Sequence, residues 1–149
     1  MKKNPYKNII ETTIRAVIEE KGKVLLCHLK GEDYYFFPGG HLEFGEKIKE
    51  SLAREIKEEL NVKMKKASFI GVVDNLFKSG SDMHHEINLF FKVEINKIST
   101  ESQEGHIDFA LINKNKLAKT KIYPVAAKKQ IVKWLKDKKV FWVSQPYKK

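Results

Sequence analysis

Apolar and polar residues alternate loosely along several short stretches of the chain, and this two-residue period is typical of β-strands. A β-rich stretch at 12–20 and another at 24–29 are separated by a Lys-Gly-Lys turn. Farther along, the turn-like segment 78–82 separates a second pair of such stretches. The pattern therefore predicts six strands, at residues 12–20, 24–29, 34–37, 68–76, 84–95 and 107–112.

Two other stretches, 47–60 and 125–135, have apolar residues at a helical spacing instead. Asn61 stands just past the first of them, where a residue able to adopt a left-handed conformation is favoured. Strands before and after both helices predict an α/β layer fold, with the sheet covered on each face. Because the chain has no internal repeat and no long Ser/Gly/Pro linker, we expect one domain over residues 1–149.

The composition, with 42% apolar and 32% charged residues, is ordinary for a globular protein. No apolar run approaches the roughly 18 residues that span a bilayer, and the N-terminus lacks the apolar core of a signal peptide. We therefore expect no membrane partner. Cys27 is the single cysteine, so no internal disulfide can form, which fits a cytoplasmic protein.

The formal net charge of +10 comes almost entirely from lysine. A basic surface attracts anions, so nucleotides, sugar diphosphates and RNA ends are all possible partners. The same charge fits a solvated lysine-rich surface equally well. The charge therefore indicates only that the partner is an anion. The sequence does not determine the oligomeric state, and a homodimer stays open.

On the first predicted helix, Glu55, Glu58 and Glu59 stand at positions i, i+3 and i+4, which share one surface. Glu59 lies at the edge of the helix's apolar stripe, so its carboxylate is expected to be partly buried beside two like charges. A divalent cation would relieve both the burial and the repulsion, and lysines are the alternative. Ligands that offer only oxygen suit Mg²⁺ or Mn²⁺ rather than zinc.

A glycine pair, Gly39 and Gly40, precedes this helix. Glycine lets the backbone approach a ligand closely, so we expect both residues to contact substrate. Most glycine pairs are simply turns, and the pair is a weak signal by itself.

At this point the residues match a known family. The pattern resembles the Nudix box, G-x5-E-x7-R-E-U-x-E-E-x-G-U with U aliphatic, at Gly40, Glu46, Arg54, Glu55, Ile56, Glu58, Glu59 and Val62. The one departure is Asn61 in place of the last glycine. Asparagine tolerates the left-handed conformation, so this departure bears on helix capping more than on chemistry. The resemblance extends over about residues 12–135, strongly at the box and weakly elsewhere.

The resemblance to Nudix hydrolases implies an α/β/α sandwich with a mixed central sheet. It also implies hydrolysis of a diphosphate linkage in a nucleoside diphosphate derivative, by attack of water on phosphorus. Mg²⁺ or Mn²⁺ would be held by four carboxylates, with a backbone carbonyl as a further ligand, at Glu55, Glu58, Glu59, Glu104 and Gly40. Glu104 enters this list because 101–109 resembles the family's loop that brings an extra acidic residue to the metals.

Within the site, Arg54 precedes Glu58 by four residues, so it is expected to pair with that carboxylate, and Glu46 is expected to join the same network. We favour Glu58 as the general base that takes a proton from water, with Glu104 as the alternative. His85 and Glu86 lie at the start of a predicted strand beside the site, and we expect them to touch substrate; a solvated strand end is the alternative.

Two other functions stay open. The first is an RNA-end pyrophosphohydrolase on the same fold, which the basic charge favours although no separate RNA-binding segment is present. The second is a non-catalytic nucleotide-binding module, which the intact glutamates argue against. An isomerase of a diphosphate substrate has no feature in its favour. Which nucleoside diphosphate derivative is cut does not follow from one sequence, because substrate choice depends on loops.

Overall fold

The computed structural model describes residues 9–98 and 100–147. Strands and helices follow one another in the order β1 (Ile9–Val17), β2 (Glu19–Glu20), β3 (Lys23–Leu29), β4 (Gly39–His41), α1 (Ile48–Leu60), β5 (Met64–Ser79), β6 (Asp82–Ile95), β7 (Ile107–Asn113), the 3-10 helix η1 (Lys114–Lys119), α2 (Val125–Asp137) and β8 (Phe141–Gln145).

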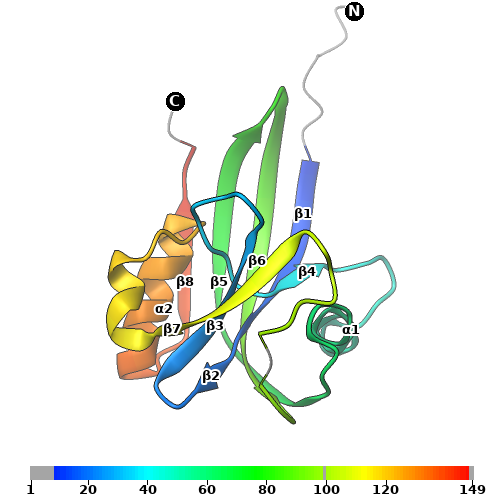
Figure 1. Ribbon diagram of the computed structural model, residues 1–149. Helices are drawn as coiled ribbons and strands as arrows, with labels where there is room; N and C mark the ends of the chain where they lie inside the picture. The colour runs from blue at the N-terminus through cyan, green and yellow to red at the C-terminus, as the bar shows by residue number, and fades with distance from the viewer. Residues whose placement is uncertain (1–8, 99, 148–149) are drawn as a thin grey trace, which may run out of the picture.

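The strands form two sheets, one of five strands in the order β4-β1-β6-β5-β8 and one of three in the order β2-β3-β7. The larger sheet is mixed, because β1 runs parallel to β6 and β5 runs parallel to β8, whereas the other pairs are antiparallel. Helices α1 and α2 lie on opposite sides of the strands (Figure 1). The predicted mixed α/β fold, with helices on both faces, is confirmed.

Two apolar cores lie on either side of strand β3, because its alternate side chains point in opposite directions. Leu25 and Cys27 pack in the core that contains Leu52, Ile56 and Leu60 of α1. Val24 and Leu26 pack in the other core, with Ala127, Ile131 and Trp134 of α2. All of these side chains are buried. The apolar stripe of α1 thus fixes which face of that helix is left for the glutamates.

Helix α1 begins at Ile48 and ends at Leu60, within one residue of the prediction. Asn61 adopts the left-handed conformation, with φ 53° and ψ 36°, and its N–H donates to the Lys57 carbonyl at 3.0 Å. The replacement of the usual glycine by asparagine therefore leaves the cap intact.

Two strand predictions are wrong, and one strand is missing from the prediction. The segment 34–37 is not a strand: it makes only isolated bridges, and the strand is Gly39–His41, which pairs with β1. The stretch 12–20 is not one strand, since β1 ends at Val17 and Glu19–Glu20 pairs in the other sheet. Strand β8 at Phe141–Gln145 was not expected at all. Within the described residues, no helix has the length and apolar character that crossing a bilayer requires.

Candidate active site

The two glycines of strand β4 bring a pair of glutamates against the backbone. The Gly39 N–H donates to Glu59 Oε2 at 3.2 Å. A β-carbon added to Gly40 would overlap the Glu55 carboxylate, and one added to Gly39 would overlap the Ile14 carbonyl of the neighbouring strand. Neither position has free space for a β-carbon in this arrangement. The contact of these two glycines with substrate stays a prediction.

Arg54 holds several carboxylates in place from the middle of α1. Its Nε and Nη2 donate to the two Glu46 oxygens at 2.8 and 3.0 Å, and Nη1 donates to Glu55 at 2.8 Å and to Glu58 at 3.3 Å. Nη2 also donates to the His41 carbonyl. The bond from Arg54 is the main cause that lowers the pKa of Glu46 to about 2. The expected pairing of Arg54 with Glu58 and Glu46 is therefore present.

The Glu59 carboxylate is buried, with 4% of the residue exposed. Burial is the largest cause that raises its pKa, to about 8, and the negative charges of Glu55 and Glu104 raise it further. The positive charge of Arg15 and the Gly39 N–H act in the opposite direction. The Glu59 carboxyl group therefore resists deprotonation unless a cation is close.

The loop that contains Glu104 is tied to the end of α1. The Gln103 N–H donates to the Glu59 carbonyl at 3.1 Å, and Ser102 hydrogen-bonds to the Glu104 N–H and carbonyl. The Glu104 carboxylate lies 3.5 Å from His106 Nε2, and it is near enough to Glu59 to raise that group's pKa. The structure therefore brings Glu104 to the glutamate cluster, although 50 residues separate it from Arg54.

Among residues 9–98 and 100–147, no group of three or more His, Cys, Asp or Glu side chains could hold a metal ion as arranged. Arg54 engages Glu55 and Glu58, while Gly39 engages Glu59. The donor set nevertheless fits a hard divalent cation, because it consists of oxygen ligands around a buried carboxyl beside a like charge. The Glu58 side chain, 52% exposed and held by one long bond, has the freedom to turn toward such a cation.

A cavity of about 610 Å³ opens on the α2 side of the large sheet and is lined in part by Arg15, Phe36, Asn75, Phe77, Glu86 and Gln145. Arg15 links this cavity to the glutamate cluster, since its charge acts on Glu59 and its Nη1 donates to the Phe37 carbonyl at 3.3 Å. An anion in the cavity would therefore be attracted by the positive charge of Arg15, on the side of the cavity that faces the glutamate cluster.

A family model of the NUDIX domain matches residues 10–135. The chain belongs to the Nudix hydrolase family. The resemblance expected from the Nudix box is therefore confirmed, and so is the class of enzyme, a Nudix-type hydrolase of phosphoric anhydrides. Nudix hydrolases generally use divalent metals, which agrees with the oxygen donors of this site.

Two relatives match part of the chain. An ADP-ribose pyrophosphatase of Methanocaldococcus jannaschii is 31% identical over 85 residues, which cover 55% of this chain and 49% of that protein. A nucleoside triphosphatase of Klebsiella pneumoniae is 45% identical over 58 residues, which cover 36% of this chain and 41% of that protein. The matches span about half of these relatives' lengths or less.

Among solved structures, the mutator MutT protein from Bacillus halodurans superposes with a TM-score of 0.65 at 19% identity. The match covers 90% of this chain and 88% of that one. At this identity the likeness shows the fold alone, which is the Nudix fold.

The two residues expected to touch substrate at the start of β6 of this Nudix chain point in opposite directions. Glu86 lines the cavity. His85 instead pairs with Asp74 on the other face of the sheet, and Asp74 also accepts a hydrogen bond from Ser144. The structure therefore brings Glu86 to the cavity and does not bring His85 there.

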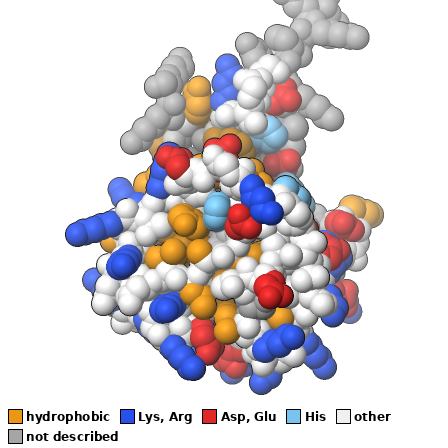
Figure 2. Space-filling view, in the orientation of Figure 1, with side chains coloured by type: hydrophobic (Ala, Val, Ile, Leu, Met, Phe, Trp, Pro, Cys, Tyr) orange, Lys and Arg blue, Asp and Glu red, His pale blue; other side chains and the backbone are white. Residues whose placement is uncertain are grey.

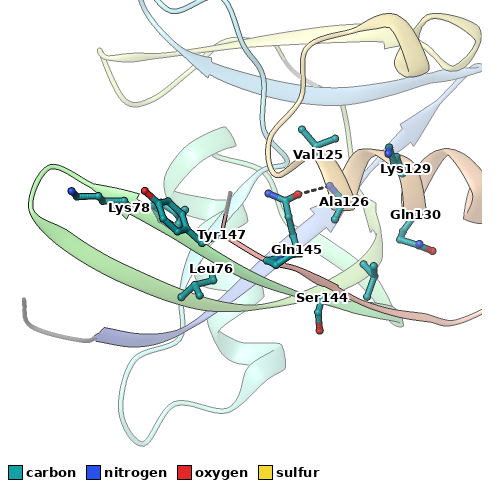
Figure 3. Close-up of a pocket in the computed structure, with 12 residues that line it drawn as sticks. Leu76, Lys78, Val125, Ala126, Lys129, Gln130, Ser144, Gln145 and Tyr147 are labelled. Carbon is teal, nitrogen blue, oxygen red and sulfur yellow. Dashed lines mark hydrogen bonds between the residues drawn. The ribbon is translucent and has the colours of Figure 1, made fainter. Parts of the chain in front are cut away.

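A second cavity of about 550 Å³ adjoins the first and lies between β8 and the start of α2 (Figure 3). Phe77, Lys78 and Gln145 line both cavities. The Gln145 side chain lies at their boundary, where its Oε1 accepts from the Ala126 N–H at 2.7 Å (Figure 3).

Sequence reasoning missed Arg15, Asn75 and Gln145. The sequence carries no local signal for Arg15, because its alternation with Ile14 and Ala16 is that of an ordinary half-exposed strand. Cys27 is buried, and this burial raises the pKa of its thiol.

Proposed function

We propose that this Nudix protein hydrolyses a diphosphate linkage in a nucleoside diphosphate derivative, by attack of water on phosphorus. The observation that carries the proposal is the buried Glu59 carboxyl beside Glu55, with its pKa raised to about 8. A buried carboxylate beside a like charge is unfavourable unless a cation neutralises it. In the chemistry of the Nudix family, the diphosphate of the substrate binds to that cation.

Mg²⁺ or Mn²⁺ would be held by Glu55, Glu58, Glu59 and Glu104, with the Gly40 carbonyl as a further ligand. When bound, the divalent cation neutralises phosphate charge and makes a water molecule easier to deprotonate. The oxygen-only donor set supports these two metals over zinc.

The chain's own residues have distinct tasks in this proposal. Arg54 fixes the rotamers of Glu55 and Glu46 through short bonds, so these carboxylates stay in place during the reaction. Glu58 is held only at 3.3 Å and is half exposed, which suits a base that must accept a proton from water. Glu104 is the alternative base, because its loop is anchored to the end of α1.

On the substrate side, the backbone of Gly39 and Gly40 would lie against the phosphates, and Glu86 would contact the nucleoside in the Arg15 cavity. The related proteins named for ADP-ribose and for nucleoside triphosphates support a small anionic nucleotide as substrate. Cytoplasmic location is part of the same proposal and rests on the single cysteine, Cys27.

The test is a panel of nucleoside triphosphates, ADP-ribose, sugar nucleotides and dinucleoside polyphosphates, assayed with Mg²⁺ for release of phosphate or pyrophosphate. We expect one class to turn over, and Glu59→Gln to lower its rate at least about a hundredfold, as loss of a key site ligand does. Glu50→Gln is the matched control, because Glu50 is exposed on the same helix. Equal rates in wild type and Glu59→Gln would remove Glu59 from the mechanism.

An RNA end is the second candidate substrate, supported by the net charge of +10 and by the many basic side chains around the face in Figure 2. Binding of a 5′-triphosphorylated oligonucleotide that weakens steeply with salt would support it, because each phosphate contact releases counterions. A flat salt dependence would count against it. A non-catalytic module is disfavoured, since Glu55, Glu58 and Glu59 are all present.

A further inference from the structure

Polar side chains are buried beneath the Arg15 cavity, where the sheet would otherwise be apolar. Thr13 and Asn88 have no exposed surface, and Asn75 is 6% exposed. They lie on the same face as Phe90 and Val73, which belong to the α2 core. Burying amides and a hydroxyl is unfavourable unless they are hydrogen-bonded, so their partners indicate what they position.

One set of these bonds fixes the Glu86 carboxylate. The Val73 carbonyl can only accept, so the Asn88 amide turns its Nδ2 toward it at 3.4 Å and toward Glu86 Oε2 at 3.3 Å. Asn88 Oδ1 then faces Thr13, whose hydroxyl donates at 2.7 Å. Glu86 Oε1 has no hydrogen-bond partner among residues 9–98 and 100–147, and Oε2 keeps acceptor capacity beyond its bond from Asn88, so both oxygens can accept from a ligand.

A second set of bonds fixes the Asn75 amide. The Ala126 N–H can only donate, so Gln145 presents Oε1 to it (Figure 3). The Nε2 atom of Gln145 is then directed toward Asn75. Gln145 Nε2 donates to Asn75 Oδ1 at 3.1 Å. Asn75 Nδ2 is therefore the group left for the cavity, as a donor, and within the described part of the chain it has no other bond.

Asn75 and Glu86 are direct partners across β5 and β6, so their side chains leave the sheet side by side. From this juxtaposition we propose that the cavity reads a guanine-type base edge, with Asn75 donating to the carbonyl and Glu86 accepting from two neighbouring N–H groups. This inference rests on the proposed function, because it identifies the nucleoside of that same substrate.

The Glu86 carboxylate favours the hydrogen-bonding edge of guanine over the edges of the other bases. Guanine presents a carbonyl, a ring N–H and an amino group in a row, which matches one donor followed by a two-oxygen acceptor. Adenine, cytosine and uracil all place a lone pair beside their single donor group, where it faces the negative carboxylate. The same negative charge keeps phosphates away from Glu86, so the base end of the substrate lies there and the phosphates lie toward Arg15.

The experiment measures binding of GMP and IMP to the full chain by calorimetry with Mg²⁺ present. Neither ligand contains a diphosphate linkage, so binding is scored apart from hydrolysis. IMP lacks only the amino group. We expect wild type to bind GMP about ten- to a hundredfold more tightly, the usual effect of one hydrogen bond to a charged group. Glu86→Gln should bring the two affinities within about threefold, because an amide cannot accept from both N–H groups.

Glu94→Gln is the matched control, an exposed carboxylate on the same strand, and should keep the preference for GMP. Thr13→Val and Asn75→Asp test the two sets of bonds separately, and each should reduce the preference, with urea denaturation confirming that each variant folds. Equal binding of GMP and IMP by wild type would overturn the inference. So would a preference that Glu86→Gln leaves intact.

The two hydroxyls of a ribose could also donate to Glu86. The compound 2′,3′-dideoxy-GMP lacks both hydroxyls, so its binding distinguishes a sugar contact from recognition of the base. Weak binding of this compound together with equal binding of GMP and IMP would assign Glu86 to the sugar and overturn base reading. The proposed function fails independently, if GMP is preferred but no compound of the diphosphate panel is cut. Conversely, hydrolysis without any preference for GMP would remove the inference and leave the function standing.

Discussion

The Glu59 carboxyl links protein stability to pH, because its pKa is raised from 4.5 to about 8 by burial first and by Glu55 second. The folded state then binds a proton more tightly than the unfolded chain does. Stability from this group is complete below pH 4.5 and is lost as the pH rises toward 8. We expect the unfolding free energy of the metal-free protein to fall over this window in urea denaturation. Glu59→Gln should remove that fall, and an unchanged profile would contradict the raised pKa.

We expect that lysine cannot replace Arg54 in function, although the substitution keeps the positive charge. Lysine lacks the planar fork that donates to Glu46, Glu55 and Glu58 at once. We expect Arg54→Lys to lower kcat/KM about ten- to a hundredfold, as loss of a supporting contact to site ligands does. Far-ultraviolet circular dichroism checks that the helix remains. A wild-type kcat/KM in this variant would show that the fork has no role.

Strand β4 packs closely against helix α1 because Gly40 has no side chain. A β-carbon at Gly40 would meet the end of the Glu55 side chain rather than backbone, so the carboxylate would move and the fold would persist. We expect Gly40→Ala to weaken metal binding about tenfold or more while shifting the thermal midpoint little. Gly105→Ala is the matched control, because open space surrounds that position and its φ is not positive. If both variants bound metal like wild type, the close approach would have no function.

Elements with a strong local pattern could be predicted from the sequence. Helix α1 has its apolar stripe and its Asn61 cap within 14 consecutive residues, so the prediction was accurate to one residue. Strands β4 and β8 depend on pairing partners distant in the chain, on β1 and on β5. The glycines of β4 and the short alternation of β8 carry no local signal of that pairing, because tertiary contacts override propensity there.

The same distinction applies to the site. The glutamates of α1 share a helix face by spacing alone, so their grouping followed from the sequence. The cavity could not be predicted, since Arg15, Asn75, Glu86 and Gln145 come from four strands and meet only through the register of the large sheet. His85 differs from Glu86 by one position, and that one step places it on the opposite face.

At the scale of the whole molecule, the net charge of +10 should act on encounter with substrate rather than on the chemical step. We expect kcat/KM for an anionic nucleotide to fall several-fold as ionic strength rises from about 0.05 to 0.5 M, because salt shortens the range of the protein's field. The kcat value should change little. Steady-state kinetics over this range provides the measurement, and a kcat/KM independent of salt would assign the lysines to solubility alone.

The role of the glutamate cluster as a metal site is tested most directly by its uptake of Mg²⁺ or Mn²⁺, measured by calorimetry with a non-hydrolysable nucleotide present. We expect the wild-type chain to bind the cation, Glu59→Gln to bind it about ten- to a hundredfold more weakly, and Glu50→Gln to bind it normally. Absence of binding by the wild-type chain, or equal binding by Glu59→Gln, would contradict a metal site at this cluster.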